Sequence, residues 1–280
     1  MMTNHDNQLT TSDRHQQNRA AWNEAASQYE ADLEERIAFL KAGGGNLMAP
    51  EMPYLQDLDK WCNRAIHLQC AGGTDTLSLW NHGAKEVVGI DISERMIAVA
   101  RRKSEAIRAN AHWHCCDLLE TPEELYSTAD LVYTGRGALC WVMDIEAWAQ
   151  IVAKLLKPGG KLYVFEGHPL DWVWDPKSDV LKLDEDEPFG NYFSHSIAKD
   201  SGWPELYIPT ELVPDVSKQE HKFERQWTLG QIMNSLIAAG LRLVRFEEHP
   251  DQYWEGLPNL PVEIANRLPH TFSLLMSKPI

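Results

Sequence analysis

The stretch that most constrains how this chain can fold runs from residue 64 to residue 91 and reads RAIHLQCAGGTDTLSLWNHGAKEVVGID. Residues 65–69 read as a short apolar strand, and the small residues 70–74 read as a turn. A helix is expected to open near Asp75, and a second apolar strand ends at an acid, Asp91. This order predicts a strand, turn, helix and strand unit of the kind that binds mononucleotides.

The chemistry of this unit indicates a class of ligand. Small residues let the backbone approach a ligand closely, and a helix N-terminus presents free N–H groups. The carboxylate of Asp91 can accept hydrogen bonds from the two hydroxyls of a ribose. We therefore expect an adenosine-containing cofactor.

Length, charge and cysteine content restrict the partners. The 280 residues are enough for one large domain, and the excess of 41 acidic over 26 basic residues gives a net charge of −15. An acidic surface repels phosphate backbones, so no nucleic acid is expected. The five cysteines lack the paired spacing of zinc or redox sites, and no window approaches the ~20 apolar residues that span a bilayer. We expect a soluble cytoplasmic protein without a membrane partner.

The chain before this unit divides into a tail and a helical region. Residues 1–17 are polar and are predicted to be disordered. From Asn18 a helical period places five residues on one face, and glycines at 43–45 then break it. The face consists of Trp22, Ala25, Ala26, Tyr29 and Leu33. We expect residues 18–62 to form a helical lid over the nucleotide unit.

Strands alternate with helices after Asp91. Strands are predicted at 111–115, 130–134 and 160–166, and an amphipathic helix before the last of them stops at the Lys-Pro-Gly-Gly of residues 157–160. Right-handed crossovers then require a parallel sheet with helices on both faces. Residues 167–226 interrupt this rhythm as an insertion. Residues 227–280 add a capped helix and two strands, which are expected to pair antiparallel at a sheet edge.

At these positions the chain resembles the class I S-adenosylmethionine-dependent methyltransferases. HLQCAGGTDTL (67–77) looks like their glycine-rich motif, GIDIS (89–93) like the strand with the ribose-binding acid, and CDLL (116–119) like the adenine loop. LKPGGKL (156–162) and the terminal strand pair also match. The resemblance implies an α/β fold with a Rossmann-like, doubly wound seven-stranded sheet of order 3-2-1-4-5-7-6, strand seven being antiparallel. We expect residues 18–280 to form one domain, in which residues 63–166 are the cofactor-binding core.

The first motif departs from the family pattern. The family usually has an acid where His67 stands and glycines where Gln69 and Ala71 stand. His67 on an apolar strand is more often a core histidine than a catalyst. Side chains at Gln69 and Ala71 narrow the room for the backbone to approach a ligand, so a different arrangement of the methionine end of the cofactor is one option.

The resemblance implies S-adenosyl-L-methionine as the cofactor and S-adenosyl-L-homocysteine as the product. Asp91 is expected to hold the ribose and Asp117 the adenine amine, with Ile92 and Leu118 against the ring. The expected cofactor-binding residues are Tyr29, Gln69, Cys70, Ala71, Gly72, Gly73, Asp91, Ile92, Met96, Asp117, Leu118, Thr134 and Gly135.

Methyl transfer is an in-line displacement, in which orientation and the exclusion of water supply most of the acceleration. A base is needed only if the acceptor loses a proton early. Tyr133 and His168 follow strand ends and are the catalytic candidates, although a loop cap is the alternative for His168. The substrate candidates are Trp22, Arg136, Trp172 and His195, and no metal site is expected.

The sequence thus favours a methyltransferase that acts on a small-molecule substrate. Residues 133–136, Tyr-Thr-Gly-Arg, differ from the Asn/Asp-Pro-Pro-aromatic motif of enzymes that methylate exocyclic base amines. Two alternatives stay open: a module that binds the cofactor without catalysis, and a nicotinamide-dependent oxidoreductase. The second would show the full G-x-G-x-x-G spacing, which is absent. The oligomeric state does not follow from the sequence, which leaves a homodimer open.

Overall fold

A computed structural model describes residues 6–175, 180–181, 190–203, 218–253 and 260–280 of the chain. Its centre is a seven-stranded sheet. Strand β11 pairs antiparallel with both of its neighbours, and the other pairs are parallel. In spatial order the strands are β3 (Ala111–Cys115), β2 (Val87–Asp91), β1 (Ala65–Leu68), β4 (Ala129–Gly135), β5 (Leu156–Gly167), β11 (Thr271–Ser277) and β10 (Arg242–His249). The predicted order 3-2-1-4-5-7-6, in which strand seven is antiparallel, is confirmed, and strand seven is β11.

Apolar side chains on both faces hold the sheet between helices. On β5, Leu162 and Val164 belong to one hydrophobic cluster, while Tyr163 and Phe165 belong to another. Both faces of the central strands are therefore buried, which is why these strands read as nearly continuous apolar runs. One cluster packs helices α7 (Ile145–Leu155) and α8 (Leu229–Ala238), and the other packs α3 (Met52–Leu55), α4 (Leu58–Trp61) and α5 (Thr74–Asn81).

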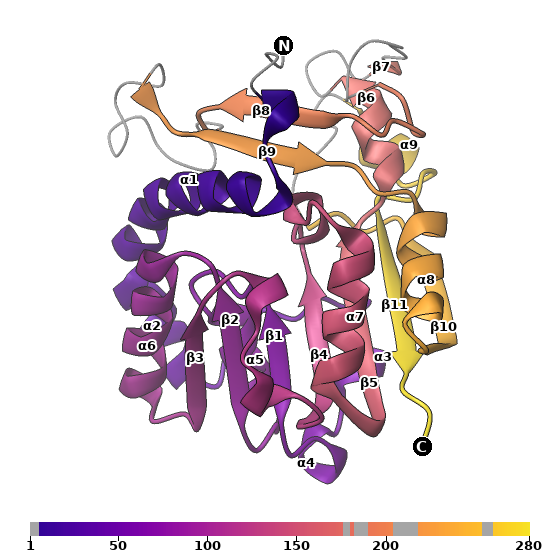
Figure 1. Cartoon of the computed structure of the whole chain (residues 1–280). Helices are drawn as coiled ribbons and strands as arrows, with labels where there is room; N and C mark the ends of the chain where they lie inside the picture. Colours follow the sequence, from indigo (N-terminus) through magenta and orange to yellow (C-terminus); the bar gives the residue numbers. More distant parts are fainter. Residues whose placement is uncertain (1–5, 176–179, 182–189, 204–217, 254–259) are drawn as a thin grey trace.

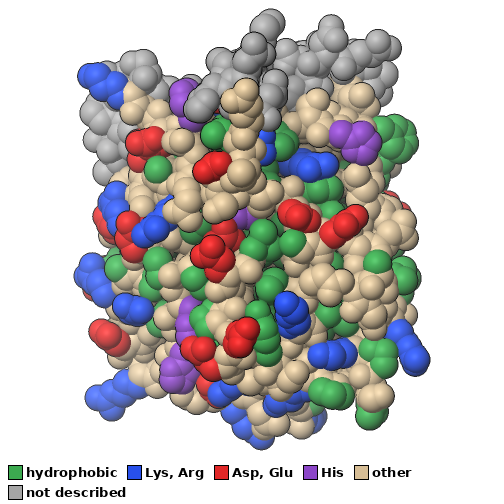
Figure 2. Space-filling view, in the orientation of Figure 1, with side chains coloured by type: hydrophobic (Ala, Val, Ile, Leu, Met, Phe, Trp, Pro, Cys, Tyr) green, Lys and Arg blue, Asp and Glu red, His purple; other side chains and the backbone are tan. Residues whose placement is uncertain are grey.

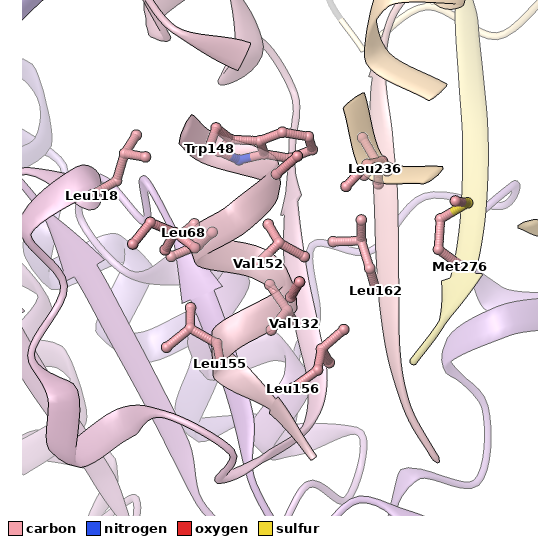
Figure 3. Close-up of a cluster of buried hydrophobic side chains, with 14 of the residues drawn as sticks. Leu68, Leu118, Val132, Trp148, Val152, Leu155, Leu156, Leu162, Leu236 and Met276 are labelled. Carbon is pink, nitrogen blue, oxygen red and sulfur yellow. The ribbon is translucent and has the colours of Figure 1, made fainter. Parts of the chain in front are cut away.

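Figure 3 shows the first of these clusters at close range. Trp148 and Val152 project from α7 toward the sheet, where Leu162 of β5 lies, and Leu236 of α8 and Met276 of β11 continue the apolar layer. Trp148 is the largest fully buried side chain among the described residues, and it holds α7 against the sheet. This packing fixes β4 and β5, whose carboxyl ends border the site described below.

The predicted disorder of residues 1–17 is wrong for the described part of that segment. Helix α1 (Thr11–Ala31) begins well before Asn18, with a capping box between Thr10 and Asp13. Polar residues of its first turns are buried because their partners come from distant parts of the chain. His15 hydrogen-bonds Asp117, and the amide of Asn18 bonds the backbone of Phe223.

Helix α1 lies across the carboxyl ends of the parallel strands, in the upper half of Figure 1, and strands β8 (Ile197–Ser201) and β9 (His221–Arg225) lie above it. The hairpin comes from the insertion at 167–226, part of which lies outside the described residues. Helix α2 (Leu33–Lys41) follows α1 and ends just before the glycines at 43–45, so the predicted break there is confirmed.

The remaining described elements are short, apart from α6. They are η1 (Asp6–Gln8), α6 (Glu94–Ile107), η2 (Leu118–Glu120), η3 (Glu123–Leu125), η4 (Leu139–Trp141), η5 (Pro169–Val173), β6 (Trp174–Asp175), β7 (Val180–Leu181) and α9 (Val262–Ala265). Within the described ranges, no helix has the length and apolar character to cross a bilayer. Figure 2 shows acidic and basic side chains interspersed over the face that it draws.

Candidate active site

A cavity of about 440 Å³ lies at the carboxyl ends of β1, β2 and β4, where residues of α1 also line it. Parallel strands bring their carboxyl ends to one edge of the sheet, and this edge is where α/β folds bind ligands. Most of the predicted cofactor residues meet here. They are Tyr29, Gln69, Cys70, Ala71, Gly72, Gly73, Asp91, Ile92, Asp117, Leu118 and Gly135, together with two predicted substrate residues, Trp22 and Arg136.

The turn after β1 keeps a glycine-like conformation although two glycines of the motif are missing. Gln69 and Ala71 have φ values of 57° and 44°, in the left-handed region that glycine favours. Two contacts hold this strained backbone: Ala71 N donates to Asp91 Oδ2 at 2.8 Å, and Gln69 Nε2 donates to Ala138 O at 2.8 Å. The Gln69 amide is thereby turned toward the loop after β4.

Asp91 closes the turn and also faces the cavity. Its Oδ1 accepts from Ser93 N at 2.9 Å, and its Oδ2 accepts from Ala71 N. Burial raises the pKa of Asp91 to about 6. Each carboxylate oxygen accepts more than one hydrogen bond, so Asp91 retains capacity for donors from a ligand in the cavity.

Asp117 is paired with a residue that sequence reasoning missed. Its Oδ2 contacts His15 Nδ1 at 2.7 Å, and its Oδ1 accepts from Leu119 N as the cap of η2. His15 Nε2 accepts from Met143 N at 3.2 Å, which assigns the ring proton to Nδ1. His15 lines the cavity, and the Thr10 and Asp13 pair, which forms the capping box of α1, is the sequence signal that could have placed His15 on a helix.

A second group of charges lies at the β1 and β4 end of the cavity. Arg136 follows β4, and its Nη1 lies 3.2 Å from Asp75 Oδ1, while its Nη2 lies 2.5 Å from Glu51 Oε2. Asn46 Nδ2 donates to Asp75 Oδ1 at 2.7 Å. Asp75 and Asn46 line the cavity with Arg136 and His67, and the sequence did not predict either of them as a site residue.

Tyr133 and His168 lie outside the cavity, and we do not retain them as catalytic candidates. Tyr133 is fully buried in the core, and its hydroxyl donates to Glu51 Oε1 at 2.7 Å. His168 Nδ1 accepts from Leu170 N at 3.0 Å, and its Nε2 lies 2.9 Å from Glu248 Oε1. His168 therefore caps η5, which is the alternative that its loop position left open.

Four other predicted site residues also lie away from the cavity. Met96 is buried in a cluster with residues of α1, and Thr134 is buried with its hydroxyl directed to Leu68 O. Trp172 lines a separate pocket of about 60 Å³, and His195 is exposed. The first two are explained by the packing of their own elements. The other two belong to the insertion, whose path the sequence pattern did not predict.

Aromatic side chains form one wall of the cavity. Trp22 and Trp141 line it, with ring centroids 5.2 Å apart, and Trp203 packs behind them at 4.9 Å from Trp22. Tyr29 lies against Gly72, where an added Cβ would meet its ring at 2.8 Å. The side of the cavity nearest α1 thus presents aromatic rings beside the polar side chains of His15, Asn18 and Gln28.

Buried Glu166 orders the loop that forms another wall. It accepts from Ala138 N at 2.8 Å and Leu139 N at 3.0 Å, and also from the backbone N–H groups of Gly137 and Gly167. Burial raises the pKa of Glu166. The Glu166 carboxylate thus accepts hydrogen bonds from four backbone N–H groups and thereby positions the loop after β4.

Part of the chain is similar to known methyltransferases. Residues 65–160 match a protein family described as a methyltransferase domain. The ubiquinone biosynthesis O-methyltransferase of Coxiella burnetii (strain Dugway 5J108-111) is 35% identical over 98 residues, which cover 35% of this chain and 41% of that protein. The human mitochondrial ubiquinone biosynthesis O-methyltransferase is 26% identical over 206 residues, covering 72% of this chain and 48% of that protein. The chain thus spans less than half the length of these curated relatives.

Solved structures share the fold. A methyltransferase dependent on S-adenosylmethionine from Mesorhizobium loti is 22% identical, with a TM-score of 0.57 and coverage of 82% of this chain and 98% of that chain. A methyltransferase from Methanosarcina mazei is 18% identical, with a TM-score of 0.58 and coverage of 84% and 99%. The chain has the fold of the class I S-adenosylmethionine-dependent methyltransferases, and the resemblance predicted from its sequence is confirmed.

Proposed function

We propose that this chain binds S-adenosyl-L-methionine in the cavity at the strand ends and transfers its methyl group to a small-molecule acceptor. The observation that carries the proposal is the arrangement of Asp91 and Asp117. Asp91 is the last residue of β2 and Asp117 comes just after the neighbouring strand β3, and both line one cavity, with the turn of residues 69–73 beside Asp91. In this arrangement Asp91 can accept from the ribose hydroxyls and Asp117 from the adenine amine of one adenosine.

The residues present fit this cofactor. Asp91 keeps acceptor capacity toward the cavity, as two ribose hydroxyls require. Ile92 and Leu118 line the cavity near the two acids and offer apolar surface to a flat base. Gln69 Oε1 is buried and has no hydrogen-bond partner in the part of the chain that the structure describes. This oxygen lies after β1, away from Asp117, and could accept a hydrogen bond from a ligand.

When bound, the cofactor supplies an electrophilic methyl group on a sulfonium. The transfer would leave the sulfur as the neutral thioether of S-adenosyl-L-homocysteine, and any proton that the acceptor loses would pass to solvent. We assign to Trp22, Trp141 and Tyr29 the exclusion of water and the orientation of the acceptor, since these rings line the cavity on the side of α1. With Tyr133 and His168 outside the cavity, orientation is the main contribution that we expect from the protein.

The acceptor that we favour is a small molecule with a planar ring. Trp22 and Trp141 offer aromatic faces to such a ring. The names of two matched relatives agree: a ubiquinone biosynthesis O-methyltransferase, and a demethylmenaquinone methyltransferase of Tropheryma whipplei that is 33% identical over 103 residues. A strongly negative net charge of −15 makes a nucleic acid acceptor unfavourable.

An acceptor panel tests this proposal. The full chain is incubated with S-adenosyl-L-methionine and phenols, quinols or non-aromatic metabolites, and S-adenosyl-L-homocysteine is measured by mass spectrometry. We expect product with at least one ring-bearing acceptor and a loss of product in Trp141→Ala. Cofactor binding without product across the panel would favour a module that binds without catalysis. Binding of a nicotinamide cofactor instead would favour the oxidoreductase.

A further inference from the structure

The cavity lacks an acid at the position where the glycine-rich motif of the family has one. His67 occupies that position on β1, and its Nδ1 is hydrogen-bonded to Thr76 Oγ1 at 2.8 Å. Burial lowers the pKa of His67 to about 4, so its ring is neutral near physiological pH. His67 therefore supplies no negative charge to a ligand in the cavity.

Asp75 is the acid that lines the same end of the cavity. It lies in the first turn of α5, with 23% of its side chain exposed. Asn46 Nδ2 and Arg136 Nη1 both contact its Oδ1, at 2.7 Å and 3.2 Å. Among the described residues none donates to Oδ2, so this oxygen remains available to a donor in the cavity.

The ion-pair group of Asp75, Glu51 and Arg136 carries one net negative charge. Lys103, which also lines the cavity, lies nearby and donates to Thr74 Oγ1. Arg136 pairs with both Asp75 and Glu51, and Glu51 is fully buried outside the cavity wall. Two carboxylates and one guanidinium sum to one net negative charge, and only Asp75 of the two acids faces the cavity. In a partly buried site, such a charge favours a cationic ligand group.

The position of this charge relative to Asp91 indicates which group it meets. An adenosine held by Asp91 and Asp117 directs the rest of the cofactor toward the ends of β1 and β4, where Gln69 and Asp75 lie. The unpartnered Gln69 Oε1 adds a second acceptor in that region. An ammonium group carries three N–H donors and suits two acceptors of this kind.

We propose that Asp75 binds the α-ammonium group at the methionine end of the cofactor and replaces the acid that the motif lacks at position 67. Arg136 is a positioning residue, which holds Asp75 by its Oδ1 and neutralises Glu51. This inference rests on the proposed function. It assigns Arg136 to the cofactor end of the cavity rather than to the acceptor.

Isothermal titration calorimetry with two ligands tests the inference. S-adenosyl-L-homocysteine carries the ammonium, whereas its deamino analogue keeps the carboxylate and lacks the amine. In Asp75→Asn, affinity for the first ligand should fall about tenfold to hundredfold, as for a lost hydrogen bond between charged groups, while affinity for the analogue stays the same. Asp59→Asn is the matched control, because Asp59 is an exposed acid in the first turn of α4, and neither affinity should change.

A second variant addresses positioning and guards against misfolding. Asn46→Ala removes one hydrogen bond to Asp75 Oδ1 without leaving a buried charge unpaired. It should lower the preference for S-adenosyl-L-homocysteine over the deamino analogue by a smaller factor, with the thermal midpoint of the free protein unchanged. A purely structural role would instead lower the midpoint and weaken both ligands alike.

The outcomes separate this inference from the proposed function. If folded Asp75→Asn keeps the wild-type preference for the amine, the assignment of Asp75 is wrong, and cofactor binding itself stands. If the wild-type chain binds neither ligand, the proposed function fails and this inference fails with it.

Discussion

Asp91 links the conformation of the turn after β1 to the proposed ligand. The same carboxylate that holds Ala71 in a left-handed conformation faces the cavity, so side chains in the motif are tolerated without loss of the turn. Gly73 has no such tolerance: its φ is 74°, and an added Cβ would lie 2.6 Å from the ring of Trp113. At the residue scale, the site depends on one acid and one glycine more than on the full motif.

Cofactor affinity should depend on the ionisation of Asp91. Its folded pKa is raised to about 6 by burial, and ribose hydroxyls donate to the ionised form. Binding therefore favours deprotonation, and affinity falls as the pH drops through 6. Between about pH 7.5 and about pH 5 we expect the dissociation constant of S-adenosyl-L-homocysteine to rise roughly tenfold. Calorimetry on wild type and Asp91→Asn measures this, and an equal pH dependence in the variant would refute the assignment.

Asp117 should contribute acceptor capacity and not only the cap of η2. Asp117→Asn keeps one oxygen acceptor, so it should weaken S-adenosyl-L-homocysteine binding less than Asp117→Ala, which we expect to cost about 1–3 kcal/mol. Titrations of both variants give the comparison, with His15→Ala as a further variant because His15 pairs with Asp117. A loss in Asp117→Asn as large as the loss in Asp117→Ala would contradict the assignment of Asp117 as an oxygen acceptor for the cofactor.

At the scale of elements, α1 is both a packed helix and a wall of the cavity. Ala21, Ala25 and Ala26 are fully buried on it, whereas Trp22 and Tyr29 line the cavity. This division refines the lid predicted for residues 18–62. Because α1 has buried contacts along much of its length, we expect a chain without residues 1–42 to lose stability as well as activity.

Tyr29 distinguishes closure of the cavity from packing. Tyr29→Ala should lower turnover and cofactor affinity about threefold to thirtyfold, with a shift of only a few degrees in the thermal midpoint, because Tyr29 is half-buried and faces the cavity. Phe39→Ala on α2 is the control, since Phe39 is an exposed aromatic residue. A sharp fall in the midpoint of Tyr29→Ala with intact affinity would show that the ring is core packing.

At the scale of the whole molecule, the sheet order and the positions of Asp91 and Asp117 were predictable. The resemblance to the methyltransferase family implied the strand order, and the two acids were placed by their positions at the carboxyl ends of apolar strands. The pairing of His15 and the contacts of His168 were not predictable, because their partners Asp117 and Glu248 are remote in the sequence. The local sequence pattern indicates which face of an element is buried. The side-chain contacts of His15 and His168 depend instead on how elements that are remote in the sequence pack together.

The central claim, that this cavity binds S-adenosyl-L-methionine through Asp91, is tested most directly by one calorimetric titration of the full chain with S-adenosyl-L-homocysteine, run in parallel on Asp91→Ala. We predict one binding site in the wild type and a loss of about 2–4 kcal/mol in the folded variant, since charge-assisted hydrogen bonds are removed and ligand hydroxyls lose their partner. An absence of binding in the wild type, or an unchanged dissociation constant in a folded Asp91→Ala variant, would contradict the account.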